Sequence, residues 1–278
     1  MFMTRAFAIA AGLFGLASAG GAQEAALPDK SGYTLFNRTP DEFMRELSAD
    51  RPDKTDCPFT VDAGHFQLEM DFANLTYDSF RSGEIAPMNA KIGLLNNLDF
   101  QLVFTPYRLE QVDKRDRETM KSGFDGITPR FKLNLIGNDG GFLAVALIPF
   151  LKLPASQDHL GNGAVEGGLG IPYSFDIPGW EVGFQTTFRF NRNETDGGRH
   201  TEFDNSISIG HRLIGNLSGY VEFFSNVSTE QEATWVGTVD TWLTYQINQN
   251  LRLDGGVYIG VTRAADDWHP WIGMTWRY

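Results

Sequence analysis

The sequence predicts an all-β protein: a transmembrane antiparallel up-and-down β-barrel of about twelve strands, with a short N-terminal periplasmic or lumenal leader. Three observations predict this fold. Apolar and polar residues alternate with a period of two through most of the chain, the connections between alternating segments are short and long in turn, and the last segment ends in an aromatic residue, Tyr278.

Composition limits the class of protein. The 278 residues carry a formal net charge of −12 and show no basic stripe, which argues against a nucleic-acid partner. Although 42% of the residues are hydrophobic, no internal stretch reaches the roughly 18 apolar residues that a membrane helix needs. A membrane protein of this composition would therefore cross the bilayer with strands, whose apolar residues are dispersed by alternation.

Residues 1–22 predict a signal peptide. Arg5 supplies a positive charge, residues 6–16 form an apolar run, and Ala17-Ser18-Ala19 is a small-residue cleavage site, with cleavage after Ala22 as the alternative. The single cysteine, Cys57, excludes an internal disulfide framework. We expect an exported protein of a Gram-negative bacterium.

Residues 23–61 predict a polar leader rather than an independent domain. Thr39-Pro40-Asp41-Glu42 predicts the start of a short helix with Thr39 as its N-cap. Phe43, Met44 and Leu47 would supply its apolar face. Pro52 and Pro58 then favour extended chain.

Residues 62–278 predict the barrel. Phe66, Leu68, Met70 and Phe72 alternate with polar residues, and residues 180–190 continue such a pattern for longer. Each segment has roughly ten residues or more, the length that a tilted strand needs to cross a bilayer. The predicted strands start near residues 64, 86, 97, 124, 141, 164, 179, 200, 216, 234, 250 and 268.

The connections predict which end of the barrel faces which compartment. Every second connection is a tight turn, which is typical of the periplasmic side. The alternative is a soluble sandwich or lipocalin-like barrel with an inward apolar face, which the charged residues on the polar faces disfavour. The tight turns are Asn96-Asn97, Asn138-Asp139-Gly140, Pro178-Gly179, Gly215-Asn216 and Asn248-Gln249-Asn250, and the longer polar connections are 110–122, 153–163, 193–199 and 229–232.

The last strand predicts where the protein resides. Its lipid-facing side carries Ile272, Met274, Trp276 and Tyr278. An apolar alternation ending in a C-terminal aromatic residue resembles the recognition signal of the outer-membrane barrel-assembly machinery. We therefore expect a bacterial outer-membrane protein that contacts the lipid bilayer, lipopolysaccharide and that machinery; the basic loop residues Lys114, Arg115 and Arg117 would meet lipopolysaccharide phosphates or remain solvated.

Parity places many charged residues on the lumen side. Their signs are nearly balanced, whereas a strongly ion-selective pore would show one dominant sign. Two interpretations stay open: salt-bridge ladders that narrow the lumen, or a direct role in transport. The residues are Glu69, Asp71, Lys91, Asp99, Arg130, Lys132, Glu166, Glu181, Arg189, Asp204, Arg212, Glu222, Asp240, Arg252, Asp254 and Arg277.

Five aromatic residues of the last four strands also point inward by parity. They are a candidate path for an apolar or aromatic solute. The alternatives are packing within a narrow barrel, or a seat for the leader. The residues are Tyr220, Phe224, Trp242, Tyr258 and Trp271.

Barrels of this size include phospholipases, so catalytic and cofactor motifs bear on the function of this chain. The sequence has no Gly-x-Ser-x-Gly turn, no zinc-ligand spacing and no phosphate loop. His159 and His211 lack the nearby serine that a nucleophile–base pair would need. The sequence therefore predicts neither an enzyme nor a metal or cofactor site.

Residues 47–55 and 58–69 resemble a family of outer-membrane transporters named for the MetA pathway of phenol degradation. The resemblance implies a barrel that moves hydrophobic or aromatic solutes. Cys57 stands where we would expect a small polar residue. The leader motif within the resemblance is Asp50, Arg51, Pro52 and Asp53.

The leader motif suggests a physical role. We expect Arg51 to pair with a lumen carboxylate such as Glu69 or Asp71 and to hold the leader in the barrel entrance; the alternative is a solvated leader. The sequence thus favours an outer-membrane channel for small solutes, hydrophobic or aromatic ones among them. The alternatives are a structural or adhesion barrel with a salt-bridged, closed lumen, and an outer-membrane hydrolase.

Overall fold

The structure is a computed structural model that describes residues 29–77, 81–111, 120–193 and 196–278. The predicted signal peptide and the three basic loop residues at 114, 115 and 117 lie outside these ranges. All strands of the described residues belong to one antiparallel sheet. The strands are β1 (Phe66–Tyr77), β2 (Arg81–Ile85), β3 (Met88–Leu95), β4 (Leu98–Gln111), β5 (Met120–Ile136), β6 (Leu143–Lys152), β7 (Glu166–Ile177), β8 (Trp180–Arg192), β9 (Arg199–Ile214), β10 (Leu217–Ser228), β11 (Val236–Asn248), β12 (Leu251–Gly260) and β13 (Trp268–Arg277).

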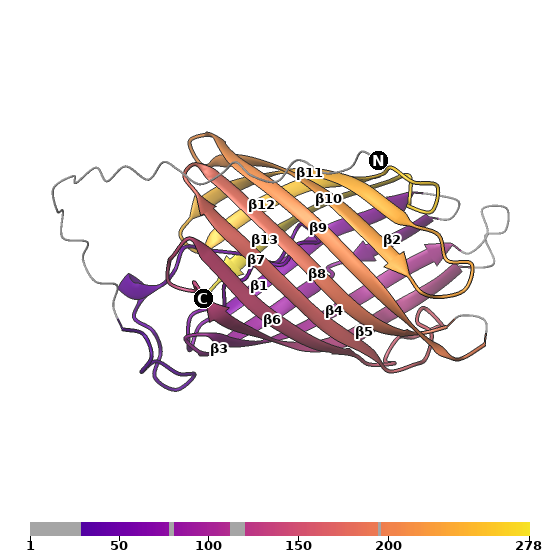
Figure 1. The fold of residues 1–278 in the computed structure, drawn as a ribbon, viewed down its shortest axis with the longest axis horizontal. Coiled ribbons are helices and arrows are strands. Elements are labelled where there is room, and N and C mark those ends of the chain that lie inside the picture. The colour runs from indigo at the N-terminus through magenta and orange to yellow at the C-terminus, as the bar shows by residue number, and fades with distance from the viewer. Residues whose placement is uncertain (1–28, 78–80, 112–119, 194–195) are drawn as a thin grey trace, which may run out of the picture.

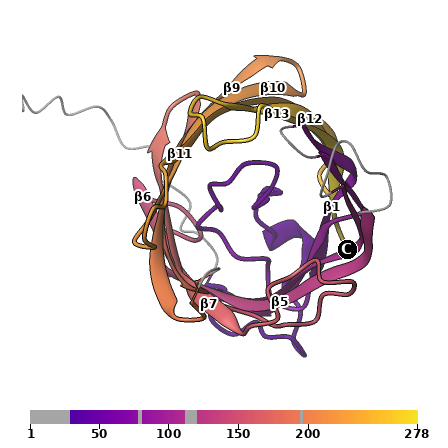
Figure 2. The same ribbon diagram turned by 90° about the vertical axis from the view of Figure 1, so that its right-hand side faces the viewer.

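The sheet closes into a barrel through its first and last strands (Figures 1 and 2). Leu68 pairs with Trp276 and Met70 with Met274. The backbone N–H of Tyr278 donates to the carbonyl of Phe66 at 2.8 Å. Closure removes the sheet edges, which would otherwise present unpaired backbone groups to lipid.

Strands β2 and β3 are two halves of one barrel strand. Each half pairs with β1 on one side and with β4 on the other. The break falls at Ala86, whose φ is 56°, and at Pro87, which has no N–H to donate to the ladder. The predicted count of about twelve strands is therefore confirmed for the barrel, but this strand begins earlier than residue 86 and is interrupted.

The barrel is apolar outside and polar inside. On β13, Ile272 and Trp276 are 56% and 40% exposed. Thr275 and Arg277, the two residues on either side of Trp276, are buried. This reverses the arrangement of a soluble barrel and suits a bilayer. The lipid-facing parity predicted for Ile272, Met274, Trp276 and Tyr278 agrees with this pattern of exposure; their role as an assembly signal stays a prediction.

No helix among the described residues is both long and apolar enough to span a membrane.

The two ends of the barrel differ in their connections. One end carries the tight turns together with the C-terminus and the indigo leader (left in Figure 1), and we call it the short-turn end. The other, the long-loop end, carries the longer connections. The predicted loop 110–122 is too long, because β4 extends to Gln111 and β5 starts at Met120.

The leader begins outside the barrel and continues into it. Figure 2, seen from the long-loop end, shows the indigo chain inside the ring. The predicted capped helix is wrong: only a 3-10 turn, Asp41–Phe43, forms, and Pro40 precedes it without a side-chain cap. The reason is tertiary, because the N–H of Thr39 donates to the carbonyl of Ala63 at 3.0 Å and Thr39 is buried there.

Candidate functional site

The candidate site is the lumen together with leader residues 48–62, which lie within it. These residues form no strand, so their backbone N–H groups need other partners. Side chains of the barrel wall supply them: Glu222 accepts from Lys54 N at 3.0 Å and Asp99 accepts from Val61 N at 2.9 Å. The polar lumen face is thus matched to an irregular chain segment.

An ionic cluster anchors the leader at the short-turn end. The Arg45 guanidinium lies 3.1 Å from Asp62 and 2.9 Å from Asp139, and it donates to the carbonyl of Asn96 at 2.9 Å. Arg277 of β13 donates to the carbonyl of Arg45 at 2.9 Å. The leader is therefore fastened to the turn between β5 and β6 and to the closing strand.

The basic wall of the lumen consists of Lys91 on β3 with Arg130 and Lys132 on β5. All three contact the carboxylate of Asp50, Lys91 at 2.6 Å and Arg130 at 3.0 Å. Burial by itself would raise the pKa of Asp50, but Lys132, Lys91 and Arg130 outweigh it and hold that pKa well below its ordinary value. Asp50 is therefore an ionised, fully partnered group.

Cys57 lies beside this cluster. Its Sγ is 3.2 Å from Oδ1 of Asp50 and 3.5 Å from Nζ of Lys132. Burial raises the pKa of the Cys57 thiol to about 11, against the opposing effect of Lys132. The thiol is thus protonated and unreactive at neutral pH.

The acidic–aromatic wall lies on β10 to β13 and comprises Glu222, Phe224, Asp240, Trp242, Asp254, Tyr258 and Trp271. Arg51 contacts it: one guanidinium nitrogen is 2.8 Å from Asp254 and the other pairs with Asp71 of β1. The guanidinium also lies 5.6 Å from the Trp271 ring centroid. Of the two partners expected for Arg51, the structure shows Asp71.

Lys54 contacts the same wall nearer the long-loop end. Its Nζ is 3.1 Å from Asp240, and it lies 4.6 Å and 4.5 Å from the ring centroids of Phe224 and Tyr258. The Tyr258 hydroxyl donates to the carbonyl of Pro52. The inward aromatic residues thus form part of the leader's seat, which was one of the alternatives left open by the sequence.

Asp53 has surroundings opposite to those of Asp50. Burial and the neighbouring carboxylate of Glu222 raise the pKa of Asp53 well above its ordinary value, while Ser208 and Arg252 oppose the rise. The leader therefore places one carboxyl group among cations and another beside an anion.

The remaining predicted lumen residues are spread along the wall. Tyr220 stacks on Trp242 with ring centroids 5.0 Å apart and donates to Glu181 at 2.9 Å. Glu69 pairs with Lys91, whereas Glu166 and Arg189 pair away from the leader, with Lys152 and Asp204. Arg212 is exposed near the short-turn end.

The sequence analysis did not predict that Lys54, Asp56 and Arg45 belong to this site. Asp56 pairs with Arg130 at 3.1 Å. The signal was present in residues 50–56, where acidic and basic residues alternate in small groups. Parity could not expose it, because an irregular segment has no alternating faces.

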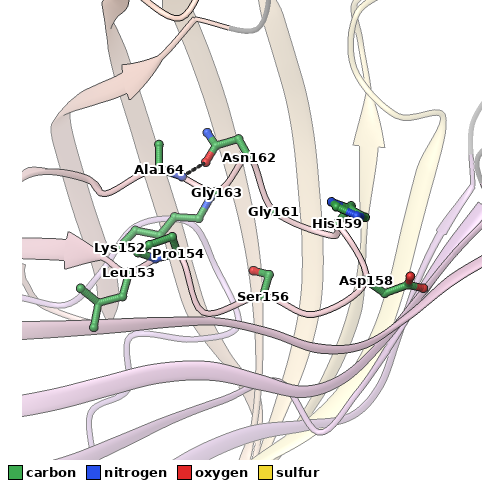
Figure 3. Close-up of a pocket in the computed structure, with 10 residues that line it drawn as sticks. All are labelled: Lys152, Leu153, Pro154, Ser156, Asp158, His159, Gly161, Asn162, Gly163 and Ala164. Atoms are coloured by element: carbon green, nitrogen blue, oxygen red, sulfur yellow. Dashed lines mark hydrogen bonds between the residues drawn. The ribbon is translucent and has the colours of Figure 1, made fainter.

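The connection between β6 and β7 holds a cavity of about 350 Å³. Figure 3 shows Ser156, Asp158 and His159 spaced along this loop. The Ser156 hydroxyl donates to Asp125 at 2.7 Å, so this hydroxyl is engaged with a carboxylate rather than with the histidine. Among the described residues, no group of three or more His, Cys, Asp or Glu side chains is arranged to hold a metal ion.

Comparison with known structures shows the fold. An outer-membrane channel from Pseudomonas putida F1 superposes with a TM-score of 0.59 and 10% identity, covering 83% of this chain and 100% of the channel. The NanC porin superposes with a TM-score of 0.52 and 8% identity, covering 76% of this chain and 98% of the porin. No curated protein sequence matches the chain. The chain thus shares the antiparallel β-barrel fold of these two outer-membrane proteins.

A family model matches residues 49–278, from the leader motif to the last residue. The match covers the seated part of the leader and every barrel strand. The protein belongs to the family described as "Putative MetA-pathway of phenol degradation".

Proposed function

We propose that the protein is an outer-membrane channel for small solutes, hydrophobic and aromatic ones among them, and that the leader closes its lumen at rest. One observation carries the proposal. Among the described residues, leader positions 48–61 meet the barrel wall through side chains and make no backbone-to-backbone hydrogen bond with a strand. Such a segment can leave the lumen without breaking the barrel ladder.

The solute class is supported by the lumen and by the family. Tyr220, Phe224, Trp242, Tyr258 and Trp271 place aromatic rings along one side of a polar channel, where a solute with an aromatic ring can stack. The family description refers to phenol degradation. The two similar structures, a channel and a porin, support a transport role.

The rest of the proposal concerns the cellular setting. The chain is exported through a cleaved signal peptide, the short-turn end faces the periplasm, and the terminal aromatic strand is read by the assembly machinery. Lipopolysaccharide contacts the outer leaflet side of the barrel. We propose no enzymatic activity and no cofactor for this protein.

A closed structural barrel is the second candidate, favoured by the ion pairs around Asp50. Planar-bilayer conductance and liposome influx of phenol on the purified full chain separate the two. We expect rare openings in the natural protein and frequent openings in Asp50→Ala. Heat-modifiable electrophoretic mobility verifies that both proteins are folded barrels. The channel proposal fails if, in that folded state, neither the natural protein nor Asp50→Ala shows any conductance or influx.

A further inference from the structure

We propose that the acidic–aromatic wall is a binding site for organic ammonium solutes, and that the Lys54 ammonium of the leader occupies this site at rest. The inference rests on the proposed channel function, since it names a solute class for that channel. It goes beyond aromatic solutes in general, because it requires a positive charge on the ligand.

The geometry around Lys54 is that of an ammonium-binding cage. Its Nζ lies 4.6 Å from the Phe224 ring centroid, 4.5 Å from the Tyr258 centroid and 3.1 Å from a carboxylate oxygen of Asp240. It also donates to the hydroxyl of Thr238 at 2.7 Å. Two rings and one carboxylate are the groups that recognise organic ammonium ions in proteins.

The wall carries more negative charge than the leader neutralises at this point. Glu222 and Asp240 lie directly opposite each other on β10 and β11, and both are fully buried. Lys54 pairs with one carboxylate oxygen of Asp240, whereas the other, Oδ1, is buried without a hydrogen-bond partner among the described residues. A buried carboxylate oxygen without a donor is unfavourable, so a free ammonium ligand that can place its N–H groups on both oxygens of Asp240 fits this site better than the tethered Lys54 ammonium, which pairs with only one.

The Lys54 contact is also the one most open to exchange. Its side chain is 26% exposed, whereas those of Lys91 and Lys132 on the basic wall are 2% and 0% exposed. Thr238 and Tyr258 are near the ends of β11 and β12 that lead into the long loops. A solute that enters from the long-loop end therefore reaches the cage before it reaches the anchored part of the leader.

Lys54 then acts as a competitor built into the chain. A solute binds only while the lysine is away from the cage, so its apparent affinity is reduced by the fraction of time that the cage is free. Removing the ammonium group raises that fraction. Lys54→Met keeps a long apolar side chain and leaves Asp240 without its cation.

The test measures binding by tryptophan fluorescence on the purified full chain, with two probes that share a ring and differ in charge. The probes are 2-phenylethylammonium and neutral 2-phenylethanol. We expect the natural protein to prefer the ammonium, and Lys54→Met to lower its dissociation constant by about tenfold or more while changing that of the alcohol much less. Lys152→Met, a lysine on β6 whose side chain is 43% exposed, is the matched control and should leave both constants unchanged.

Further variants keep the inference falsifiable. Asp240→Asn should abolish the preference for the ammonium while the barrel retains its heat-modifiable mobility. Equal binding of both probes by the natural protein and by Lys54→Met would overturn the inference, as would a preference that persists in Asp240→Asn.

Influx measured on the same samples tests the proposed function separately. Ammonium-selective binding together with phenol influx supports both proposals. Ammonium-selective binding without conductance or influx refutes the channel proposal and supports the binding site. Phenol influx without a preference for the ammonium probe supports the channel and refutes the ammonium-binding site.

Discussion

Asp50 and Lys54 are close together in the leader, and they contact opposite sides of the lumen. Asp50 is surrounded by Lys91, Arg130 and Lys132 of the basic wall and is 6% exposed. Lys54 has one carboxylate and two rings of the acidic–aromatic wall as partners, and its side chain is 26% exposed.

The difference separates a fixed contact from an exchangeable one. If Asp50 leaves, three buried cations lose a shared partner, and an uncompensated buried charge is costly. If the Lys54 ammonium leaves Asp240, Phe224 and Tyr258, these groups become free to bind another cation. The leader is therefore complementary in charge to both walls, but only the acidic–aromatic wall offers a site that a solute can share.

Asp50→Ala should have the largest effect on this comparison. Lys91 and Arg130 keep Glu69 and Asp56 as partners, but the buried Lys132 loses the carboxylate that it pairs with. This should cost the seated leader about 3–5 kcal/mol and raise the open probability in planar bilayers by a factor of about 100 or more. Asp41→Ala is the control, because Asp41 pairs with Arg38 on the exposed part of the leader, where an ion pair contributes about 1 kcal/mol or less. Equal open probabilities in Asp50→Ala and the natural protein would show that Asp50 does not hold the leader.

Arg51→Ala should have the next largest effect. Arg51 is the cation between Asp71 and Asp254, but its side chain is 14% exposed, so we expect a smaller cost of about 2 kcal/mol. The measurements are the heat stability of the barrel and the leakage of small solutes from liposomes. Arg51→Lys should restore only part of the effect, because an ammonium group lacks the planar fork that bridges two carboxylates. Unchanged heat stability and leakage in Arg51→Ala would refute its anchoring role.

Asp53 should make closure depend on pH. Its pKa is raised in the seated leader by burial and by Glu222, against Ser208 and Arg252. Below the ordinary aspartate pKa both the seated and the released leader are protonated, so Asp53 has no effect. Above it, the released leader ionises first, and closure weakens by up to about 1.4 kcal/mol per pH unit until the raised pKa is reached.

Open probability should therefore rise with pH in this window, and Asp53→Asn should flatten the profile. Asp50 contributes in the opposite sense: its lowered pKa stabilises closure above the ordinary aspartate pKa, and that contribution is lost only as the pH falls through the lowered value. A profile that is the same in Asp53→Asn and in the natural protein would contradict the assignment to Asp53.

Cys57→Ser should have the smallest energetic effect, about 1 kcal/mol or less, because Asp50 keeps its cations. The thiol is more useful as a reporter. Because burial raises its pKa to about 11, alkylation of the natural protein at pH 8 should be slower than that of a free cysteine by about a hundredfold. Asp50→Ala should accelerate the reaction, and fast alkylation of the natural protein would show that the basic wall does not enclose the leader.

Much of the barrel could be predicted from the sequence because alternation is a local property. The period of two decides which side chains of β13 face lipid, and Ile272 and Trp276 are exposed as expected. The inward positions of Trp242, Asp240 and Lys91 follow from the same parity, and all three are buried. The interruption at Ala86 and Pro87 was missed, since the break preserves the pairing of both halves with β1.

The contacts of the leader could not be predicted in the same way. The Thr39 side chain was expected to cap a helix, but it does not, and the backbone N–H of Thr39 donates to the carbonyl of Ala63. Lys54 meets Asp240, which is 186 residues later in the chain, and Tyr258 beyond it. No local pattern specifies these partners, because they depend on how deep the leader reaches into the closed ring.

The sequence by itself determined a membrane barrel, its approximate strand count and the side of each strand that faces the lumen, because strand geometry imposes a fixed alternation on neighbouring residues. Only the tertiary structure decided that the basic residues gather on β3 and β5, that carboxylates and rings gather on β10 to β13, and that the leader lies between them. The physical reason is that the sheet closes into a ring. Strand order around a ring brings together residues that are far apart in sequence, and an irregular segment inside that ring is placed by its charges rather than by a repeat.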